Sequence, residues 1–555
     1  MDPRHEYLDH AGLTAVLQRW AADHPDLVRL TSLATTPEGR ELWLLTLGPE
    51  PDRVRPSMLV DGNMHAAELA GSSVCLGFAH DVLRVHLGED VHGLSPALLR
   101  AVRECLVYVV PRMSPDGAES VLKTGRYVRS APRDHRHAKH HAHWINQDLD
   151  GDGLAFVMRV QDPTGELVES TEVPGLLVGR TLDDDGPFYK VYPEGVIANF
   201  DGFDVPSPDF LSDTQTDFNR NFPFGWAPPH VQVGAGAFPA SEPEVAAMVR
   251  FTTAHPEIFC WVNYHCFGGV VIRPLGDQPD SKLPPGDLAL LRLVEQWATD
   301  FTGYPTVPGV EFVYAPDTPL HGDLVDYAWH QRGALSWVVE LWDLFEEVGL
   351  PKADRFVDRY TRLERAELEA LARWDAEHNE GRILRPWTPF RHPQLGDVEI
   401  GGLDPRVGLW NPPPDRLPGV VDAQSRMLLH AAALTPRLQL DVDARLDGDH
   451  LHLTLVVENH GYLSTRFIES AAGLEHNEPL TATVITDGEV LGPRRVTVGH
   501  LDGWGRGRWD GSNALYFQRT RGSTGRRTVC FDLRGASEWR VTVGSCRVGW
   551  WSFEG

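Results

Sequence analysis

The stretch Phe259-Cys-Trp-Val-Asn-Tyr-His-Cys-Phe267 is a mostly apolar run that predicts a buried strand with a histidine near its end. A second apolar run ends in Val60-Asp-Gly-Asn-Met-His-Ala-Ala-Glu68, where a histidine and a glutamate stand three residues apart. Apolar runs that end in polar, metal-competent side chains are typical of the carboxyl ends of sheet strands in α/β enzymes, where active sites collect. These two runs therefore decide both the expected fold and the expected place of the site.

Three residues of these runs form a set of candidate metal ligands. His65, Glu68 and His265 supply two imidazoles and one carboxylate, the ligand set of a catalytic zinc whose fourth position is open for water. Taken alone, a histidine in a strand is more often a hydrogen-bonded core residue, and a chain with 25 histidines is expected to contain about one His-x-x-Glu pair by chance. That all three residues stand at the ends of apolar runs favours a zinc site and metal-assisted hydrolysis.

A carboxylate in a third apolar run, Leu335-Ser-Trp-Val-Val-Glu-Leu-Trp342, has two interpretations. Burying Glu340 between Val339 and Leu341 costs free energy unless the carboxylate has a partner or a chemical role. The periodicity of a strand also allows the side chain to point to an exposed face of the sheet. The functional interpretation is a general base beside the metal.

Composition restricts the classes of partner and compartment. The formal net charge of −27 argues against nucleic acid and anionic membrane as partners, because both would repel the chain. No apolar run approaches the roughly 18 to 20 residues of a membrane span, and the first residues lack the apolar segment of a secretory signal. The six cysteines fit reduced thiols, although Cys530 and Cys546 could pair across adjacent strands. We therefore expect a cytoplasmic protein, whose oligomeric state the sequence does not indicate.

The chain divides into two parts by its patterning. Up to residue 385, apolar runs alternate with helix-like segments at 69–86, 241–255, 287–301 and 353–378. This alternation predicts an α/β domain with a mixed, mainly parallel sheet flanked by helices. Residues 386–555 begin with Pro- and Gly-rich sequence and a short helix, and continue as alternating segments such as 450–457. They predict a linker followed by an all-β, sandwich-like accessory module without a catalytic constellation.

The motifs together resemble the zinc carboxypeptidase family typified by pancreatic carboxypeptidase A. The resemblance runs through most of the first 345 residues, and six motifs occur in the family's order: His65-Ala-Ala-Glu68, Pro115-Asp-Gly117, Gly125-Arg-Tyr-Val-Arg-Ser130, Asp217-Phe-Asn-Arg-Asn221, His265 and Val339-Glu-Leu-Trp-Asp343. No single motif is specific, but six in one order are. The resemblance implies the carboxypeptidase fold, one zinc ion, and a peptide substrate with a free C-terminus.

The resemblance also implies a role for each site residue. The zinc ligands are His65, Glu68 and His265. Asp217 orients His65 from behind, Glu340 is the general base, and Arg126 with the metal stabilises the oxyanion. Asn219 and Arg220 hold the terminal carboxylate of the substrate. The implied reaction is hydrolysis of the C-terminal peptide bond.

The chain departs from the family at several positions. The family's arginine before the zinc glutamate is Ala67 here, which removes a secondary substrate contact. Tyr314 is the best candidate for the family's lid tyrosine, although its spacing from Glu340 differs. The specificity pocket falls near Val325, which favours an apolar terminal side chain, although Asp323 nearby could admit a basic one. Residues from about 131 to 216 form a long insertion that could roof or narrow the cleft.

The insertion contains two further features. Asp148, Asp150 and Asp152 place oxygen ligands at alternate positions, and a glycine stands where a calcium loop turns sharply, but Arg159 stands where an EF-hand has its bidentate glutamate. Either an Asp- and Gly-rich turn without metal or a partial Ca²⁺ site fits this pattern. Several histidines between residues 135 and 143 fit a solvated loop near the rim of the cleft, with adventitious metal binding as the alternative.

Three functions remain open from the sequence. The first is a zinc-dependent metallocarboxypeptidase. The second uses the same site chemistry in a cell-wall or γ-glutamyl peptidase, or in an amidase of acylated amino acids. The third is a non-catalytic binding protein, against which the retention of Glu340 and Arg126 argues, because a binding protein has no use for a buried base.

Overall fold

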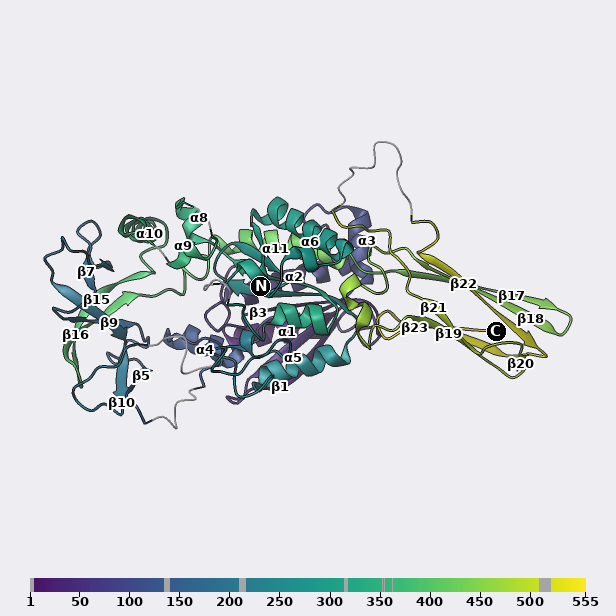
Figure 1. Ribbon diagram of the computed structural model, residues 1–555, viewed down its shortest axis with the longest axis horizontal. Coiled ribbons are helices and arrows are strands. Elements are labelled where there is room, and N and C mark those ends of the chain that lie inside the picture. The colour runs from purple at the N-terminus through teal and green to yellow at the C-terminus, as the bar shows by residue number, and fades with distance from the viewer. Residues whose placement is uncertain are drawn as a thin grey trace.

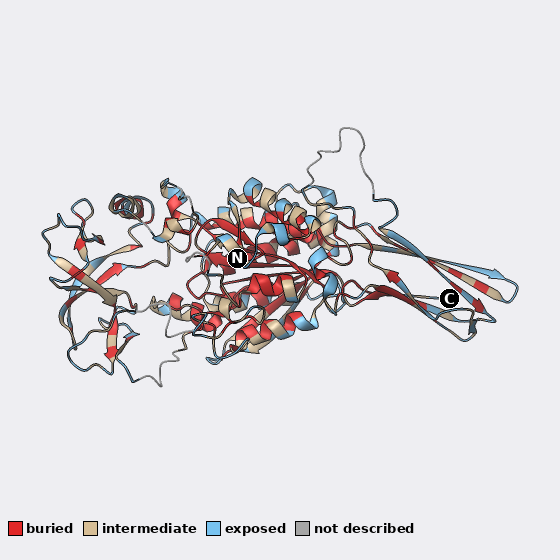
Figure 2. Cartoon of the chain, viewed as in Figure 1, coloured by how far each residue is buried: buried red, intermediate tan, exposed pale blue. Residues whose placement is uncertain are grey.

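The computed structural model describes residues 4–133, 140–208, 216–313, 318–351, 353, 355–361, 363–508 and 521–555. A central body of sheet and helices lies between a β-rich lobe at one end and a β-sandwich at the other (Figure 1). Buried residues are concentrated in the strands of the central body, whereas the two ends carry more exposed and intermediate positions (Figure 2). The main hydrophobic core therefore belongs to the central body.

An eight-stranded sheet forms the centre of this body, in the order β1-β2-β4-β3-β11-β14-β12-β13. Its strands are β1 (Val28–Thr35), β2 (Glu41–Leu47), β3 (Ser57–Gly62), β4 (Leu106–Val110), β11 (Ile258–Cys266), β12 (Val270–Arg273), β13 (Thr306–Pro308) and β14 (Leu335–Leu341). The pairings β4–β3, β3–β11, β11–β14 and β12–β13 are parallel, and the other three are antiparallel. The expected mixed, mainly parallel sheet is confirmed.

Helices cover both faces of the sheet. Every residue of β3 and β11 is buried, as expected for strands covered on both sides. One hydrophobic cluster includes residues of α1 (His10–Asp23), α2 (Ala70–Leu87), α6 (Pro285–Trp297) and α11 (Leu417–Ala432), and another includes residues of α5 (Pro243–Ala254). A Cβ on Gly71 would stand 2.9 Å from the Asn63 amide nitrogen and 3.1 Å from the Tyr264 carbonyl oxygen. Glycine therefore lets the start of α2 approach the ends of β3 and β11 closely.

The β-lobe combines two distant parts of the chain. A six-stranded antiparallel sheet pairs β6 (Val157–Gln161), β7 (Leu167–Glu169), β8 (Leu177–Gly179) and β9 (Phe188–Pro193) with β15 (Leu384–His392) and β16 (Gly396–Leu403). Beside it lie the paired strands β5 (His143–Asn146) and β10 (Gly195–Ala198) (Figure 1). Arg159 links the two parts, because its guanidinium lies 4.5 Å from the Tyr189 ring and 4.7 Å from the Trp387 ring and pairs with Glu169 and Glu399.

The C-terminal module consists of two four-stranded antiparallel sheets, which confirms the expected all-β region. One sheet contains β17 (Leu438–Asp447), β18 (His450–Asn459), β22 (Arg526–Arg534) and β20 (Glu489–Val490). The other contains β21 (Arg495–Gly499), β19 (Leu480–Thr486), β23 (Trp539–Ser545) and β24 (Gly549–Glu554). Along β18 every second residue is buried, as in a strand with one face on a core and one in solvent. The six cysteines are free.

Buried polar contacts fasten this module to the central body. Asp287 of α6 accepts hydrogen bonds from the backbone amides of Glu469 (2.6 Å) and Ser470 (2.8 Å). Arg547 is fully buried, donates to the Gly333 carbonyl oxygen at 2.9 Å, and has its guanidinium carbon 3.9 Å from the centre of the Phe467 ring. Such contacts between charged side chains and backbone fix the orientation of the module.

Residues 386–433, expected as a linker, are built into the folded units. Strands β15 and β16 belong to the β-lobe, and α11 packs against α2 in the central body. The buried side chains of α11 include Val421, Met427 and Leu428. The change of composition at residue 386 therefore does not mark the end of the α/β unit.

This architecture predicts different outcomes for two truncations. We expect a chain that ends at residue 435 to fold and one that ends at residue 385 to be insoluble. The shorter chain lacks α11 and exposes the apolar side of α2, at a cost of about 1.5–3 kcal/mol for each large side chain uncovered. The longer chain loses only the module, so its melting temperature should fall below that of the full chain. Soluble yield and thermal unfolding measure both effects, and equal stability of the two truncations would contradict the assignment of α11.

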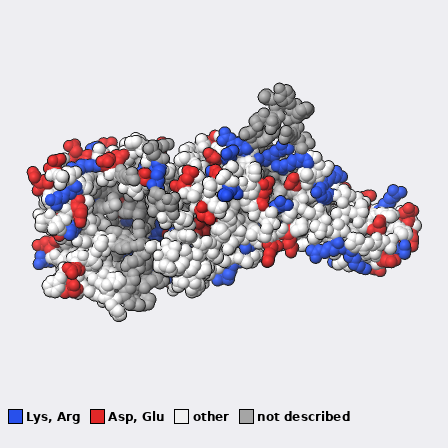
Figure 3. Space-filling model, in the orientation of Figure 1, with Lys and Arg blue, Asp and Glu red and all other residues white. Residues whose placement is uncertain are grey.

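The surface carries charges of both signs. On the face shown in Figure 3, acidic and basic side chains are interspersed over the β-lobe, the central body and the sandwich. The negative excess is therefore not gathered at one place on that face. In the parts of the chain described here, no helix is both long and apolar enough to cross a membrane.

Candidate active site

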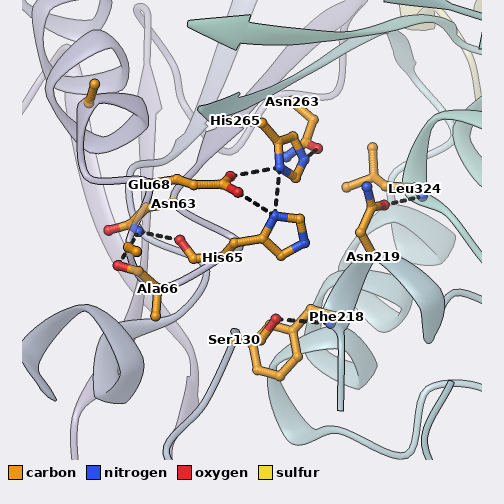
Figure 4. Close-up of polar contacts among 12 residues, drawn as sticks. Asn63, His65, Ala66, Glu68, Ser130, Phe218, Asn219, Asn263, His265 and Leu324 are labelled. Carbon is orange, nitrogen blue, oxygen red and sulfur yellow. Dashed lines mark hydrogen bonds and ion pairs between the residues drawn. The ribbon is translucent and has the colours of Figure 1, made fainter. Parts of the chain in front are cut away.

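His65, Glu68 and His265 lie together at the carboxyl edge of the central sheet (Figure 4). His65 Nδ1 is 2.7 Å from Glu68 Oε1, His265 Nδ1 is 2.8 Å from Glu68 Oε2, and the two Nδ1 atoms are 3.0 Å apart. The three residues are buried, with exposed fractions of 5%, 6% and 1% in the same order. The structure therefore brings the expected ligand set together in one place.

Parallel pairing of β3 and β11 produces this arrangement. Gly62 at the end of β3 lies opposite Tyr264 in β11, so His65 and His265 leave the sheet at the same edge. Asn63 begins the ligand loop with a positive φ of 55°. Its side-chain amide donates to the carbonyl oxygens of His65 at 2.8 Å and Ala66 at 3.1 Å, which fixes the turn.

The donor atoms fit a zinc ion. His65 Nε2 lies 3.0 Å from Asp217 Oδ1, and His265 Nε2 makes a short hydrogen bond to Asn263 Oδ1. Both acceptors place the ring proton on Nε2, so both Nδ1 atoms present lone pairs to each other and to the Glu68 carboxylate. A cation between these atoms would relieve the repulsion of their lone pairs. Ligand atoms of a tetrahedral zinc lie about 3.3 Å apart, only slightly more than the separations here.

Arg129 is a residue of this site that the sequence analysis did not single out. Its Nε donates to Asp217 Oδ2 at 2.9 Å, and its Nη1 lies 3.6 Å from Glu68 Oε1. Burial raises the pKa of Asp217, but the charges of Arg129, His65 and Arg220 outweigh this effect and hold the pKa well below its ordinary value. Asp217 is therefore an ionised carboxylate that accepts from His65 and Arg129 together.

Arg126 has a different environment from Arg129. Its backbone N–H is 3.3 Å from Thr124 Oγ1, and its Nε is buried without a hydrogen-bond partner. Within the described ranges, no hydrogen bond or ion pair joins Arg126 to the three ligands. Among the described residues the Nε of Arg126 thus has no hydrogen-bond partner, whereas the Nε of Arg129 is held by Asp217.

Glu340 reaches the same edge of the sheet as the ligands. In the parallel pair of β11 and β14, His265 lies directly opposite Glu340. Burial and the charge of Glu68 raise the pKa of Glu340 well above its ordinary value, while Arg129 and Arg220 act in the opposite direction. A glutamate placed in this way is a candidate proton acceptor beside the ligand set.

Asn219 and Arg220 lie in a short 3-10 turn, η1 (Phe218–Arg220). Asn219 Oδ1 accepts from the Leu324 amide at 2.9 Å, which ties η1 to the short helix α7 (Leu324–Asp326) (Figure 4). Arg220 Nη1 donates to the Asn219 carbonyl oxygen at 2.6 Å, and the part of the chain described here holds no ion pair of Arg220. Val325 packs in a small apolar cluster with Val270 and Val338.

Two expectations gain nothing from the structure. Tyr314 lies outside the described residues. The carboxylates of Asp148, Asp150 and Asp152 lie close enough to share a cation but are exposed. They accept turn amides instead, among them Gly151 N to Asp148 at 2.6 Å and Leu154 N to Asp152 at 2.7 Å. These contacts are those of an Asp- and Gly-rich turn, and the calcium interpretation gains no support from the structure.

Comparison with known sequences identifies curated relatives of part of this chain. The zinc carboxypeptidase of Saccharothrix mutabilis subsp. capreolus is 32% identical over 113 residues, which are 20% of this chain and 25% of that protein. Carboxypeptidase D of Mus musculus is 31% identical over 106 residues, 19% of this chain and 7% of the relative. The chain therefore matches a quarter or less of the length of these relatives.

Solved structures align with part of this chain at low sequence identity. Thrombin activatable fibrinolysis inhibitor aligns with a TM-score of 0.41 and 16% identity over 61% of this chain and 69% of that one. A metallo-carboxypeptidase from Burkholderia cenocepacia aligns with a TM-score of 0.35 and 14% identity over 76% of this chain and 68% of that one. At these identities and TM-scores, the structural similarities add nothing to the functional assignment of this chain.

Family sequence models match both parts of the chain. Residues 439–554 match a domain of unknown function. Residues 13–158 and 197–357 match the zinc carboxypeptidase model, so the unmatched stretch between them is shorter than the insertion expected over 131–216. Because the two ranges of the zinc carboxypeptidase match together span more than half of the 555 residues, the chain belongs to the zinc carboxypeptidase family.

Proposed function

We propose that the protein is a zinc-dependent metallocarboxypeptidase that hydrolyses the C-terminal peptide bond of peptides. The observation that carries this proposal is the convergence of two imidazole Nδ1 atoms and one carboxylate within 3.0 Å of one another. Glu340 lies opposite His265 on the neighbouring strand, and Arg220 stands close enough for its charge to act on Glu340. These positions support a metal-binding ligand set, a candidate base and a candidate carboxylate anchor at one edge of the sheet.

The metal would be held by His65, Glu68 and His265. When bound there, zinc polarises the scissile carbonyl and lowers the pKa of a bound water to about 7. Asp217 and Asn263 hold the Nε2–H groups of the two histidines, so each ring presents Nδ1 to the metal. The ion pair with Arg129 keeps the Asp217 carboxylate ionised and holds it in place beside His65.

Glu340 would move the proton in the reaction. Its raised pKa makes it a better proton acceptor than an exposed glutamate, and two arginines limit the shift. During attack Glu340 accepts the proton of the nucleophilic water, and it then passes this proton to the nitrogen of the leaving amine. The same carboxyl group thus acts first as base and then as acid.

Arg126 would stabilise the oxyanion of the tetrahedral intermediate. The alternative within the same motif is Arg129, whose Nε is already occupied by Asp217. Arg126 has a buried Nε without a partner, so its guanidinium can donate to a substrate oxygen without breaking an existing ion pair. This difference supports the assignment of Arg126.

Asn219 and Arg220 would bind the terminal carboxylate of the substrate. The Leu324 amide occupies Asn219 Oδ1, which leaves the side-chain amide nitrogen as a donor. Arg220 can add a charge-assisted contact. Beyond them Val325 offers an apolar wall for the terminal side chain, with Asp323 as the feature that would instead favour a basic one.

The experiment compares two peptides that differ only in a free or an amidated C-terminus. We expect the zinc-loaded protein to release the last residue from the free peptide and to leave the amidated one largely intact, as followed by mass spectrometry. Equal rates on both peptides would overturn carboxylate anchoring and favour an amidase or endopeptidase. Release only from γ-linked peptides would favour the cell-wall or γ-glutamyl peptidase, and no hydrolysis of any peptide would favour a binding protein.

A further inference from the structure

A short connector outside the family match lies against the ligand loop. Residues 404–411, defined here as the connector, lie between β16 and α11, beyond the last residue matched by the family model, 357. Within it, Asn411 is completely buried. The connector is more than 300 positions from the zinc-ligand loop in sequence, yet hydrogen bonds join the two directly.

Asn411 holds the backbone on both sides of Glu68. Its Oδ1 accepts the Ala70 amide at 2.9 Å, and its Nδ2 donates to the Ala67 carbonyl oxygen at 2.7 Å. The same Nδ2 lies 2.7 Å from the Arg406 carbonyl oxygen, and the Asn411 carbonyl accepts from Gly408 at 2.7 Å. Asn411 is therefore fixed within the connector while it bridges the residues that flank the carboxylate ligand.

The Asn411 side chain supplies a hydrogen-bond acceptor that the start of α2 lacks. The first amides of a helix have no partner within the helix and are commonly satisfied by the side chain of the N-cap residue. Here the N-cap is Leu69, which offers no acceptor, and no side-chain cap bond is formed. Asn411 takes this role for Ala70 from a distant part of the chain, so the position of α2 relative to Glu68 depends on it.

The connector also contacts the strand that carries Glu340. Trp342, two residues after Glu340, donates from Nε1 to the Gly408 carbonyl oxygen at 2.8 Å. Trp410 packs against the cluster that contains Ala66 and Ala67. One segment of eight residues thus touches both the ligand loop and the end of the strand that holds the base.

We propose that Asn411 is a positioning residue for the zinc ligand Glu68, and that the connector is part of the metal centre of this protein. The inference rests on the proposed zinc site. Glu68 can bind the metal firmly only if the turn from Ala67 to Ala70 is rigid, and Asn411 is the side chain that fixes both ends of that turn. Substituting it should loosen the ligand without touching the metal.

The test measures the rate at which zinc leaves the folded, zinc-loaded protein in the presence of excess chelator. Asn411→Ala removes both bridging bonds, and Asn411→Asp keeps an acceptor for Ala70 but loses the donor to Ala67. We expect zinc to leave both variants about tenfold faster or more, the range found when partners behind metal ligands are removed. The aspartate variant keeps the helix cap, so it remains informative if the alanine variant does not fold.

Asn459→Ala is the matched control. Asn459 is also a buried asparagine that uses both ends of its amide, accepting from Gly461 at 2.9 Å and donating to Leu463 at 2.8 Å, but it lies in the sandwich. Its substitution should lower the melting temperature and leave the zinc release rate unchanged.

Three outcomes would count against the inference. Wild-type release rates from folded Asn411 variants would overturn it and leave the zinc site intact. Equal acceleration in Asn459→Ala would assign the effect to general loosening of the fold. A wild-type protein that takes up no zinc would refute the proposed function itself, and the inference with it.

Discussion

Glu340→Gln should lower kcat by about 10² to 10⁴ while the protein keeps its zinc, because loss of a general base typically costs this much. The substitution keeps the shape of the side chain and removes the group that accepts the proton. Glu340 is not a metal ligand in this account, so metal content should equal that of the wild type. Turnover of a free C-terminal peptide and elemental analysis of the same sample give both numbers.

Glu346→Gln provides the control for this measurement. Glu346 is an exposed glutamate six residues further along the chain, beyond the end of β14. The control should turn over at the wild-type rate. Near-normal turnover in Glu340→Gln would mean that another group activates the water, and a loss of zinc would mean that Glu340 belongs to the ligand set.

Arg220→Ala should weaken cleavage of peptides with a free C-terminus by about 2 to 5 kcal/mol of transition-state stabilisation, the cost of removing one partner of a desolvated charge pair. Arg220 has no ion pair within the described ranges, so its expected partner is the substrate carboxylate. The slow cleavage of amidated peptides should change little. Values of kcat/KM for a matched pair of peptides measure the difference.

Arg126→Ala offers a contrast within the same assay. An oxyanion donor acts on the scissile carbonyl, so its loss should lower kcat/KM for free and amidated peptides by the same factor. If Arg220→Ala behaved in this way, Arg220 would be acting on the reacting carbonyl and not on the terminal carboxylate. If Arg126→Ala had no effect while Arg129→Ala did, the oxyanion role would pass to Arg129.

The convergence of the three candidate ligands could be predicted because its signals are local. His65 and Glu68 are three residues apart at the end of one apolar run, and His265 ends another. Parallel pairing of β3 with β11 is enough to bring the two runs together. The strand that carries Glu340 also pairs in parallel with β11, so the position of Glu340 beside His265 follows from patterning as well.

Other parts of the site depend on contacts that no local pattern reports. Arg126 and Arg129 share one motif, and only the fold shows that Arg129 is held by Asp217. Asn411 reaches the ligand loop from a Pro- and Gly-rich stretch that the sequence indicates as linker. Helix α11 was expected only as part of that linker, because the apolar surface it covers on α2 is hundreds of residues away.

In the β-lobe, too, local sequence predicts a turn but not which strands pair. The turn at Asp148 could be read from its Asp and Gly residues, and the structure shows it satisfied by its own amides. The pairing of β6 with β16 could not, because two strands more than 200 residues apart carry no shared signal. Arg159, noted in the sequence only as a mismatch to a calcium loop, lies in β6 with its guanidinium against the rings of Tyr189 in β9 and Trp387 in β15.

The zinc content of the wild type, His265→Ala and His141→Ala tests whether these residues form the metal centre. We expect about one zinc per chain in the wild type, since three ligands with an open fourth position match that metal. We expect His265→Ala to lose stoichiometric zinc and His141→Ala to retain it, because His141 is an exposed histidine outside the ligand set. Stoichiometric zinc that survives His265→Ala unchanged would contradict the assignment of the metal centre.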